Sequence, residues 1–189
     1  MKAKEISGIV LAGGAGKRMG TDKSELTLGG KTLMEIQVQK LRQIGIEDIM
    51  ISGSSASAEG TRSIQDIYPE KGPIGGVHAC LKAAKNPACL VVSVDVPLVP
   101  AKVLEELVEA HEGGATVLNC DGKIEPLMAV YDTALAQRAE ELIQSGERAV
   151  RRLSNNPAVK QVEYTGDADL LLNCNTPEDY EKAKALWKE

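Results

Sequence analysis

The chain has 189 residues, of which 43% are hydrophobic and 26% charged, as expected of one soluble globular domain. Its net charge of −5 argues against a general attraction to nucleic acid or to an anionic membrane, because either would favour a basic surface. The four cysteines form no C-x-x-C pair, and the apolar run near the start is too short for export or for membrane spanning. We therefore expect reduced thiols and a cytoplasmic protein.

A glycine-rich loop follows the first predicted strand. Residues 6–12 form a continuous apolar run, which is typical of a parallel strand covered on both faces. The loop after this run has glycines at 13, 14, 16 and 20 and carries Lys17, Arg18 and Lys23. Glycine lets backbone amides approach anionic oxygens, and the cations supply charge that amides lack. The loop therefore predicts a site for a polyphosphate.

Two familiar phosphate loops do not fit this spacing. A P-loop has a glycine five positions before its Gly-Lys-Ser/Thr triplet, but Leu11 occupies that position and Arg18 follows Lys17. The dinucleotide fingerprint G-x-G-x-x-G also fails, because one residue too many precedes Gly20. A tight turn with surface cations is the simpler alternative. Three cations within seven residues favour the phosphate site.

The next segments predict a strand–helix–strand unit. Residues 33–44 repeat apolar side chains at helical spacing and are followed by Gly45, a typical helix end. Residues 49–51 then predict a second strand, so the two strands should be parallel with a right-handed crossover. We interpret residues 52–62 as a loop and residues 64–67 as a short strand.

Two further polar positions follow predicted secondary structure. The glycine-rich residues 72–76 precede an apolar stretch, 77–81, which predicts a loop that leads into a helix N-terminus. Residues 90–95 predict an apolar strand that ends in Asp95, where open α/β sheets gather their ligands. A carboxylate at this place is a natural Mg²⁺ ligand. The alternative role, a cap for the next helix, is disfavoured because Pro97 intervenes.

The second half of the chain predicts alternating helices and strands. We expect a helix at 103–108, with His111 solvated near its C-terminus. Residues 115–119 and 127–131 predict two strands of a hairpin, and 135–143 predict a further helix.

Polar side chains recur towards the C-terminus. Three arginines have the spacing of one face of a short helix, which is either a solvated surface or a contact for a phosphate-bearing substrate: Arg148, Arg151 and Arg152. In an extended segment, Asn173 and Asn175 would point to the same side. Thr176 followed by Pro177 predicts the start of the last helix.

The motifs together resemble the nucleotidyltransferases that join a nucleoside monophosphate to a phosphorylated acceptor. Within that superfamily, the chain is most similar to the molybdenum cofactor guanylyltransferase family. The resemblance implies an α/β fold of three Rossmann-like layers over residues 1–189, with a mostly parallel sheet and helices on both faces. It rests on Leu-Ala-Gly-Gly at 11–14, Arg-Met-Gly at 18–20, Asp22-Lys23, Leu-Gly-Gly-Lys-Thr-Leu at 28–33, the loop 72–76 and Asn-x-Asn-Thr-Pro-Glu-Asp at 173–179.

The resemblance also implies substrates and roles. GTP would be the donor, molybdopterin with or without molybdenum the acceptor, Mg²⁺ the metal, and proteins of the same pathway the partners. Lys23 would contact the reacting phosphates, Arg18 the leaving pyrophosphate, and Asp95 the Mg²⁺. The remaining nucleotide contacts would be Leu11, Ala12, Gly13, Gly14, Ser52, Asp66 and Gly72, with Ser52 at a position where the family commonly has Asn. The acceptor contacts would be Glu125, Asn173 and Asn175.

Other functions remain open from the sequence alone. The same signature suits the cytidylyltransferase of this cofactor or a sugar- or polyol-phosphate nucleotidyltransferase. A catalytically silent nucleotide sensor on the same fold is a further alternative. Such a sensor could dispense with the cations or the acid, whereas this chain has Arg18, Lys23 and Asp95 together.

Overall fold

The computed structural model describes residues 1–13, 26–53, 57–155 and 158–187 of the chain. The predictions for Gly14, Arg18 and Lys23 lie outside these ranges. Among the helices that are described, none combines the length and the apolar character needed to cross a membrane.

Seven strands of the described chain form one sheet, in the order β5-β4-β1-β6-β8-β7-β9. Strand β8 is antiparallel to its neighbours β6 and β7, and the other neighbouring pairs are parallel. The predicted mostly parallel sheet is confirmed. The strands are β1 (Ile6–Leu11), β4 (Ile49–Ser52), β5 (Arg62–Ile64), β6 (Ala88–Ser93), β7 (Ala115–Cys120), β8 (Lys123–Asp132) and β9 (Lys160–Glu163).

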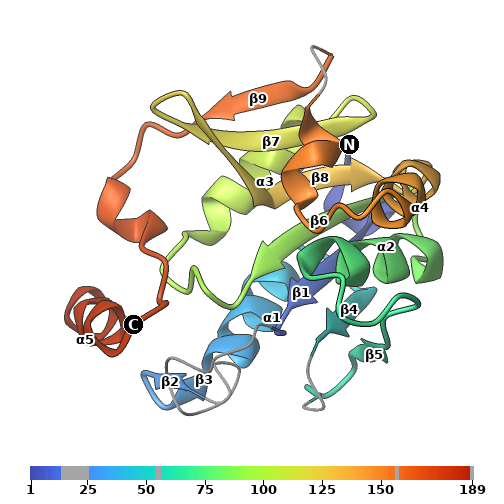
Figure 1. The fold of residues 1–189 in the computed structure, drawn as a ribbon. Helices are drawn as coiled ribbons and strands as arrows, with labels where there is room; N and C mark the ends of the chain where they lie inside the picture. Colours follow the sequence, from blue (N-terminus) through green and yellow to red (C-terminus); the bar gives the residue numbers. More distant parts are fainter. Residues whose placement is uncertain (14–25, 54–56, 156–157, 188–189) are drawn as a thin grey trace.

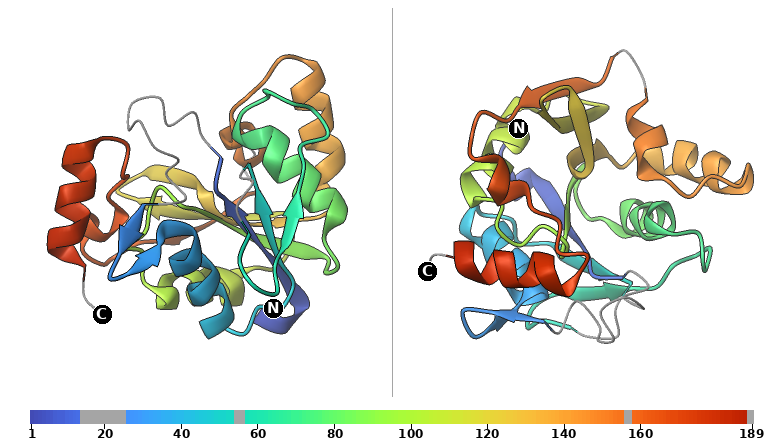
Figure 2. Two further views of the ribbon diagram at one scale, coloured as in Figure 1. Left: turned by 90° about the horizontal axis from the view of Figure 1, so that it is seen from below. Right: turned by 60° about the vertical axis from the view of Figure 1, so that its left-hand side comes forward.

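Helices cover both faces of the sheet, as Figures 1 and 2 show. Alternate side chains of the fully buried strand β1 enter two separate cores. Ile6 and Val10 pack in the core shared with α1 and α3, whereas Ile9 and Leu11 pack in the core shared with α2 and α4. The predicted three-layer α/β arrangement is confirmed. The helices are α1 (Leu33–Gln43), α2 (Pro73–Ala83), α3 (Ala101–Ala110), α4 (Leu135–Gln144) and α5 (Pro177–Leu186).

The last helix packs against a small hairpin. Helix α5 begins at the predicted cap, where the Thr176 hydroxyl accepts the Asp179 N–H at 3.1 Å. Its Tyr180 hydroxyl accepts the N–H of Thr27 at 3.1 Å, in the hairpin of β2 (Thr27–Leu28) and β3 (Lys31–Thr32). The C-terminal helix is thereby connected to the segment that follows residues 14–25 (Figure 1).

Two predicted strands have different boundaries. Strand β5 covers Arg62–Ile64 rather than 64–67, because it continues the parallel ladder in which Ser52 pairs with Ile64. Strand β6 ends at Ser93, before the predicted end at Asp95. The chain turns there, and the Asp95 N–H donates to the Ser93 hydroxyl at 3.2 Å.

The expectation of a solvated His111 is wrong. The residue is buried, with Nδ1 3.0 Å from the Thr116 hydroxyl and Nε2 2.9 Å from the Asp132 carboxylate. Asp132 lies at the end of β8 and Thr116 in β7, so the imidazole joins the end of α3 to the sheet. Such long-range partners are invisible to a local sequence pattern.

Candidate functional site

A cavity of about 340 Å³ lies where β1, β4 and β6 end and α2 begins. In open α/β sheets, ligands bind outside the carboxyl ends of the strands, and this cavity has that position. A neighbouring hollow of about 640 Å³ shares Asp66 in its wall. The structure brings six of the predicted site residues to the first cavity: Leu11, Gly13, Ser52, Asp66, Gly72 and Asp95.

Two glycines allow β1 and β4 to meet at the cavity. A Cβ atom on Gly13 would lie 2.5 Å from the Gly53 Cα, a distance that real Cβ atoms essentially never show. Gly53 also has a φ of 83°, which favours glycine. The N–H of Ala12, predicted to contact the base, donates to the Ser52 carbonyl at 2.9 Å. The strand ends are therefore fixed to each other, and any larger side chain would separate them.

Ser52 and Asp66 form a polar pair in the cavity wall. The buried Ser52 hydroxyl donates to Asp66 Oδ1 at 3.2 Å. A Cβ on Gly76 would lie 2.4 Å from the same hydroxyl, so the glycine leaves the space that Ser52 occupies. The pair presents a positioned carboxylate, an acceptor for N–H groups of a ligand.

The N-terminus of α2 contributes to the same cavity. Gly72 is its N-cap residue, with a φ of 68°, and Pro73 follows at the first helical position. No side chain caps this end in the described structure. The first N–H groups of a helix favour an anion, especially where no side-chain acceptor satisfies them. The predicted role of the 72–76 loop in phosphate binding is consistent with this geometry.

Asp95 lies in the turn after β6, at the cavity wall. Within the described ranges, no cluster of three or more His, Cys, Asp or Glu side chains is arranged to hold a metal. A preformed protein cage is therefore absent from this part of the chain. The carboxylate nevertheless suits Mg²⁺, which commonly binds through one or two carboxylates together with substrate phosphates.

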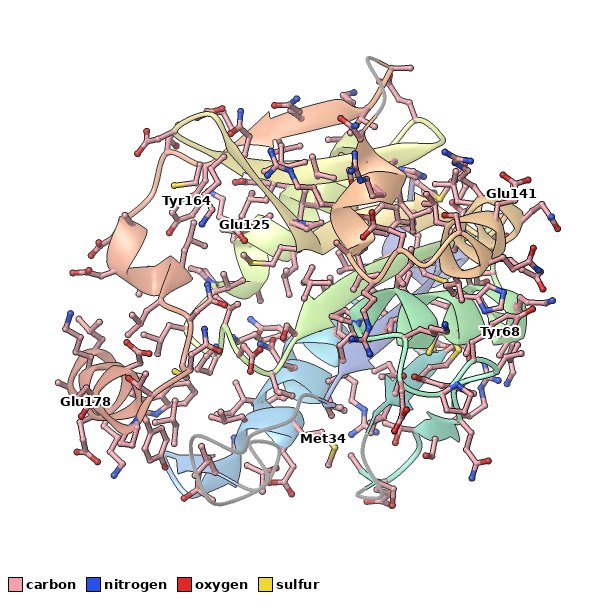
Figure 3. All side chains as sticks on the ribbon, viewed as in Figure 1. Met34, Tyr68, Glu125, Glu141, Tyr164 and Glu178 are labelled. Carbon is pink, nitrogen blue, oxygen red and sulfur yellow. The ribbon has the colours of Figure 1, made fainter. Side chains whose placement is uncertain are left out.

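The predicted acceptor residues lie around the cavity and do not line it. Glu125 is on β8 and pairs with Lys123 at 3.4 Å, whereas Leu127 of the same strand lines the wall. Figure 3 shows Glu125 on the side of the molecule where Tyr164 lies. Asn173 and Asn175 flank the buried Cys174, whose N–H donates to the Asp95 carbonyl at 2.7 Å. The asparagine segment is thus joined to the Asp95 turn.

The arginines do not share one helical face. The 3₁₀ helix η3 (Val150–Ser154) contains Arg151 and Arg152 but not Arg148. Arg152 pairs with Glu147 at 2.9 Å, whereas the Arg148 guanidinium donates to the carbonyl of Glu70, a cavity residue. Arg148 therefore supports the cavity rim, and the predicted common face is wrong.

Sequence patterns missed several lining residues. Gly53, Glu70, Ser93 and Leu127 line the cavity without having been predicted. Gly53 had one available signal, because a glycine directly after a buried strand often marks a close approach of two chains. Glu70 has a φ of 61°, which nothing in its residue type indicates.

Comparison with known proteins identifies relatives of nearly full length. A molybdenum cofactor guanylyltransferase of Cereibacter sphaeroides (strain ATCC 17029) is 32% identical, with 97% of this chain and 98% of the relative aligned. A probable molybdenum cofactor guanylyltransferase of Opitutus terrae is 37% identical over 79% of this chain and 78% of its own length.

A solved structure agrees with the fold. Molybdopterin-guanine dinucleotide biosynthesis protein A from Archaeoglobus fulgidus superposes with a TM-score of 0.79 at 28% identity, covering 96% of this chain and 98% of its own. Residues 8–162 match the family model described as the MobA-like NTP transferase domain. Both strand ends and the helix start that form the cavity lie inside the matched range. The chain belongs to the MobA-like NTP transferase family, together with the molybdenum cofactor guanylyltransferases.

Proposed function

We propose that this nucleotidyltransferase transfers GMP from GTP to the terminal phosphate of molybdopterin, with or without molybdenum, and releases pyrophosphate. The observation that carries the proposal is the single cavity that gathers Ser52, Asp66 and Asp95 where three strands end. The nearly full-length relatives named molybdenum cofactor guanylyltransferase support GTP and molybdopterin as the substrates. Proteins of the same cofactor pathway are the partners we expect to deliver the acceptor.

The reaction needs positioning and charge neutralisation more than covalent chemistry. An oxygen of the acceptor phosphate attacks the α-phosphorus of GTP in line. A new P–O bond forms as the bond to the bridging oxygen breaks, and pyrophosphate leaves with that electron pair. Mg²⁺ bound to the phosphates supplies charge neutralisation, and we assign its protein ligand to Asp95.

The positive charge for this reaction must be local, since the net charge is −5. We assign Lys23 to the phosphates at the reacting centre and Arg18 to the pyrophosphate side. The N-terminus of α2 at Gly72 adds uncapped helix N–H groups at the same cavity, which favours anions. Both cations lie outside the described ranges, so their assignment rests on the sequence motif.

The Ser52–Asp66 pair favours guanine over cytosine. Guanine presents two adjacent donors, the N1–H and the 2-amino group, on one edge. A carboxylate accepts two such hydrogen bonds in parallel, whereas cytosine offers it only the 4-amino donor. Ser52, which donates to Asp66 Oδ1, holds the carboxylate in the wall. We therefore assign guanine recognition to Asp66, with the backbone of Leu11, Ala12 and Gly13 on the other side of the base.

The acceptor would approach from the side of the asparagine segment. The Cys174–Asp95 backbone hydrogen bond supports this direction, because it places the neighbouring Asn173 and Asn175 close to the turn that carries the metal ligand. Both flanking residues are exposed and their amides can bind phosphate or pterin groups. Glu125 would contribute from β8.

The proposal is tested by measuring pyrophosphate release with molybdopterin and each of the four nucleoside triphosphates. We expect turnover with GTP and little with ATP, CTP or UTP. Preferred use of CTP would assign the chain to the cytidylyltransferase of the same cofactor. Tight GTP binding without transfer to molybdopterin or to sugar phosphates would instead indicate a nucleotide sensor.

A further inference from the structure

Gln37 is an unusual residue for its position in α1. The helix buries Leu33, Met34, Ile36 and Leu41, and Gln37 lies among them with 1% of its surface exposed. Glutamine is rarely buried so completely, because its amide loses hydrogen bonds to water. An apolar side chain of similar volume would fill the space at lower cost. The buried amide therefore calls for a reason other than packing.

The amide is used to hold the turn that carries Asp95. Gln37 Nε2 donates to the carbonyl of Ser93 at 2.8 Å and to the carbonyl of Val96 at 3.0 Å. These two residues bracket Asp95, so one side chain fixes both ends of the turn. Among the described residues, Gln37 Oε1 has no hydrogen-bond partner, which leaves the two donated bonds as the visible use of the group.

A second side chain of the same helix extends this contact by one residue. Lys40 lies one position less than a helical turn beyond Gln37, and its Nζ donates to the Pro97 carbonyl. Burial lowers the pKa of Lys40 to about 7, and both the ammonium and the amine retain an N–H for this bond. On the other side of the turn, the Cys174 N–H holds the Asp95 carbonyl itself.

We propose that Gln37, assisted by Lys40, is a positioning residue that fixes the Asp95 turn for metal-dependent transfer. This inference rests on the proposed function, in which Asp95 binds the metal. Groups that orient a metal ligand typically change metal affinity or activity by about 10- to 100-fold when they are removed. The turn has no regular secondary structure of its own, so its geometry depends on these side-chain donors.

The test compares Gln37→Met with Gln39→Met, the same substitution on the exposed face of the same helix, where Gln39 contacts only the Lys31 amine in the described structure. Transfer is measured at saturating GTP and molybdopterin while Mg²⁺ is varied. We expect Gln37→Met to raise the half-saturating Mg²⁺ concentration by about 10-fold or more, with little change in the KM for GTP at high Mg²⁺. Gln39→Met should behave as the unmodified protein.

Two further variants separate positioning from stability. Val38→Ala truncates a buried side chain in the same helix and should lower the melting temperature without changing the Mg²⁺ dependence. Gln37→Met combined with Asp95→Asn should be no worse than Asp95→Asn alone, because Gln37 acts through Asp95. Where Gln37→Met does not fold, Lys40→Met decides, with a smaller rise in the half-saturating Mg²⁺ concentration expected.

The failures are distinguishable. An unchanged Mg²⁺ dependence in Gln37→Met, or in Lys40→Met where Gln37→Met does not fold, overturns the positioning role if Asp95→Asn has lost activity. Fully additive effects in the double variant overturn it as well. Normal transfer and normal Mg²⁺ dependence in Asp95→Asn would instead refute the metal assignment, and the positioning role with it.

Discussion

The two ends of the parallel strands use polar side chains in opposite ways. At the amino end, the Asp48 carboxylate receives hydrogen bonds from the Ser7 hydroxyl at 2.6 Å, the Arg62 guanidinium at 2.8 Å and the Lys85 N–H at 3.1 Å. The Asn86 N–H in turn donates to the Ser7 hydroxyl at 3.3 Å. These groups come from β1, β5 and the ends of α2 and β4, and they satisfy one another.

At the carboxyl end, the corresponding acids face a cavity. Asp66 receives the Ser52 hydroxyl at 3.2 Å, and both residues line the 340 Å³ space together with Asp95. The nearby Glu70 carbonyl binds Arg148, but no comparable network closes over the acids in the described ranges. The carboxylates remain positioned for a ligand.

The comparison separates stability from function along the same strands. Burial alone would raise the pKa of Asp48, but the hydrogen bonds from Ser7, Lys85 and Arg62 outweigh it and hold that pKa below its ordinary value. A carboxylate stabilised in this way contributes to the free energy of unfolding. The acids at the other end can spend their interactions on a substrate. Four substitutions can break or sharpen this contrast.

Asp95→Ala should have the largest effect on activity. Removing one group that stabilises charge at the reacting centre typically lowers the rate by about 10² to 10³. Lys23→Ala should produce a loss of similar size. The measurement is the steady-state rate of pyrophosphate release with GTP and molybdopterin, with urea unfolding as the control for folding. Near-normal turnover in either variant would contradict its assignment.

Asp48→Ala should have the largest effect on stability. It leaves the Ser7 hydroxyl and the Lys85 N–H without their acceptor, and hydrogen bonds to charged groups contribute roughly 1.5 to 3 kcal/mol. The half-exposed Arg62 adds less, because water screens its charge. Urea unfolding should therefore show a loss of about 2 to 3 kcal/mol. The kcat of the folded enzyme should be unchanged, and a selective fall in kcat would place function at this end as well.

The contribution of Asp48 should also depend on pH. Because its pKa in the folded state is below the ordinary 3.8, its stabilisation is fully present above that value and is lost as the pH falls through the folded pKa. The difference in free energy of unfolding between the unmodified protein and Asp48→Asn should be constant from pH 7 to about pH 5 and shrink below about pH 4. A difference that grows on acidification would contradict the lowered pKa.

The smallest expected effects come from one substitution made at each end. Ser7→Ala removes the donor to Asp48 and should lower the free energy of unfolding by about 1 kcal/mol, with an unchanged KM for GTP. Ser52→Ala removes the donor to Asp66 and should instead raise the KM for GTP severalfold. Equal effects of both substitutions on KM would remove the distinction between the ends.

Local patterns predicted the elements that form the site. The apolar runs of β1, β4 and β6 and the glycines before α2 marked the strand ends and the helix start, and the rule for open α/β sheets then placed Ser52, Asp66 and Asp95 at one edge. The family resemblance, not the local pattern, selected Asp66 from the other turn acids. These predictions succeeded because each depends on neighbours in the sequence.

The contacts that the sequence did not predict join distant segments. His111 is buried because Thr116 and Asp132 complete its hydrogen bonds, and Gln37 is buried because the Ser93–Val96 turn receives its amide. Helical periodicity assigns such residues to a face but does not identify the partners that lie across the core. The same limit hid the Asp48 network.

The most direct test is the nucleotide preference of Asp66→Asn, measured as kcat/KM for GTP and for xanthosine triphosphate. Xanthine replaces the 2-amino donor of guanine with a carbonyl acceptor, and an asparagine amide can donate to it. We predict that the unmodified enzyme prefers GTP and that Asp66→Asn reverses the preference by at least about 10-fold, as a lost and regained hydrogen bond in a buried site implies. An unchanged preference for GTP in Asp66→Asn would contradict the assignment of this cavity to the guanine base.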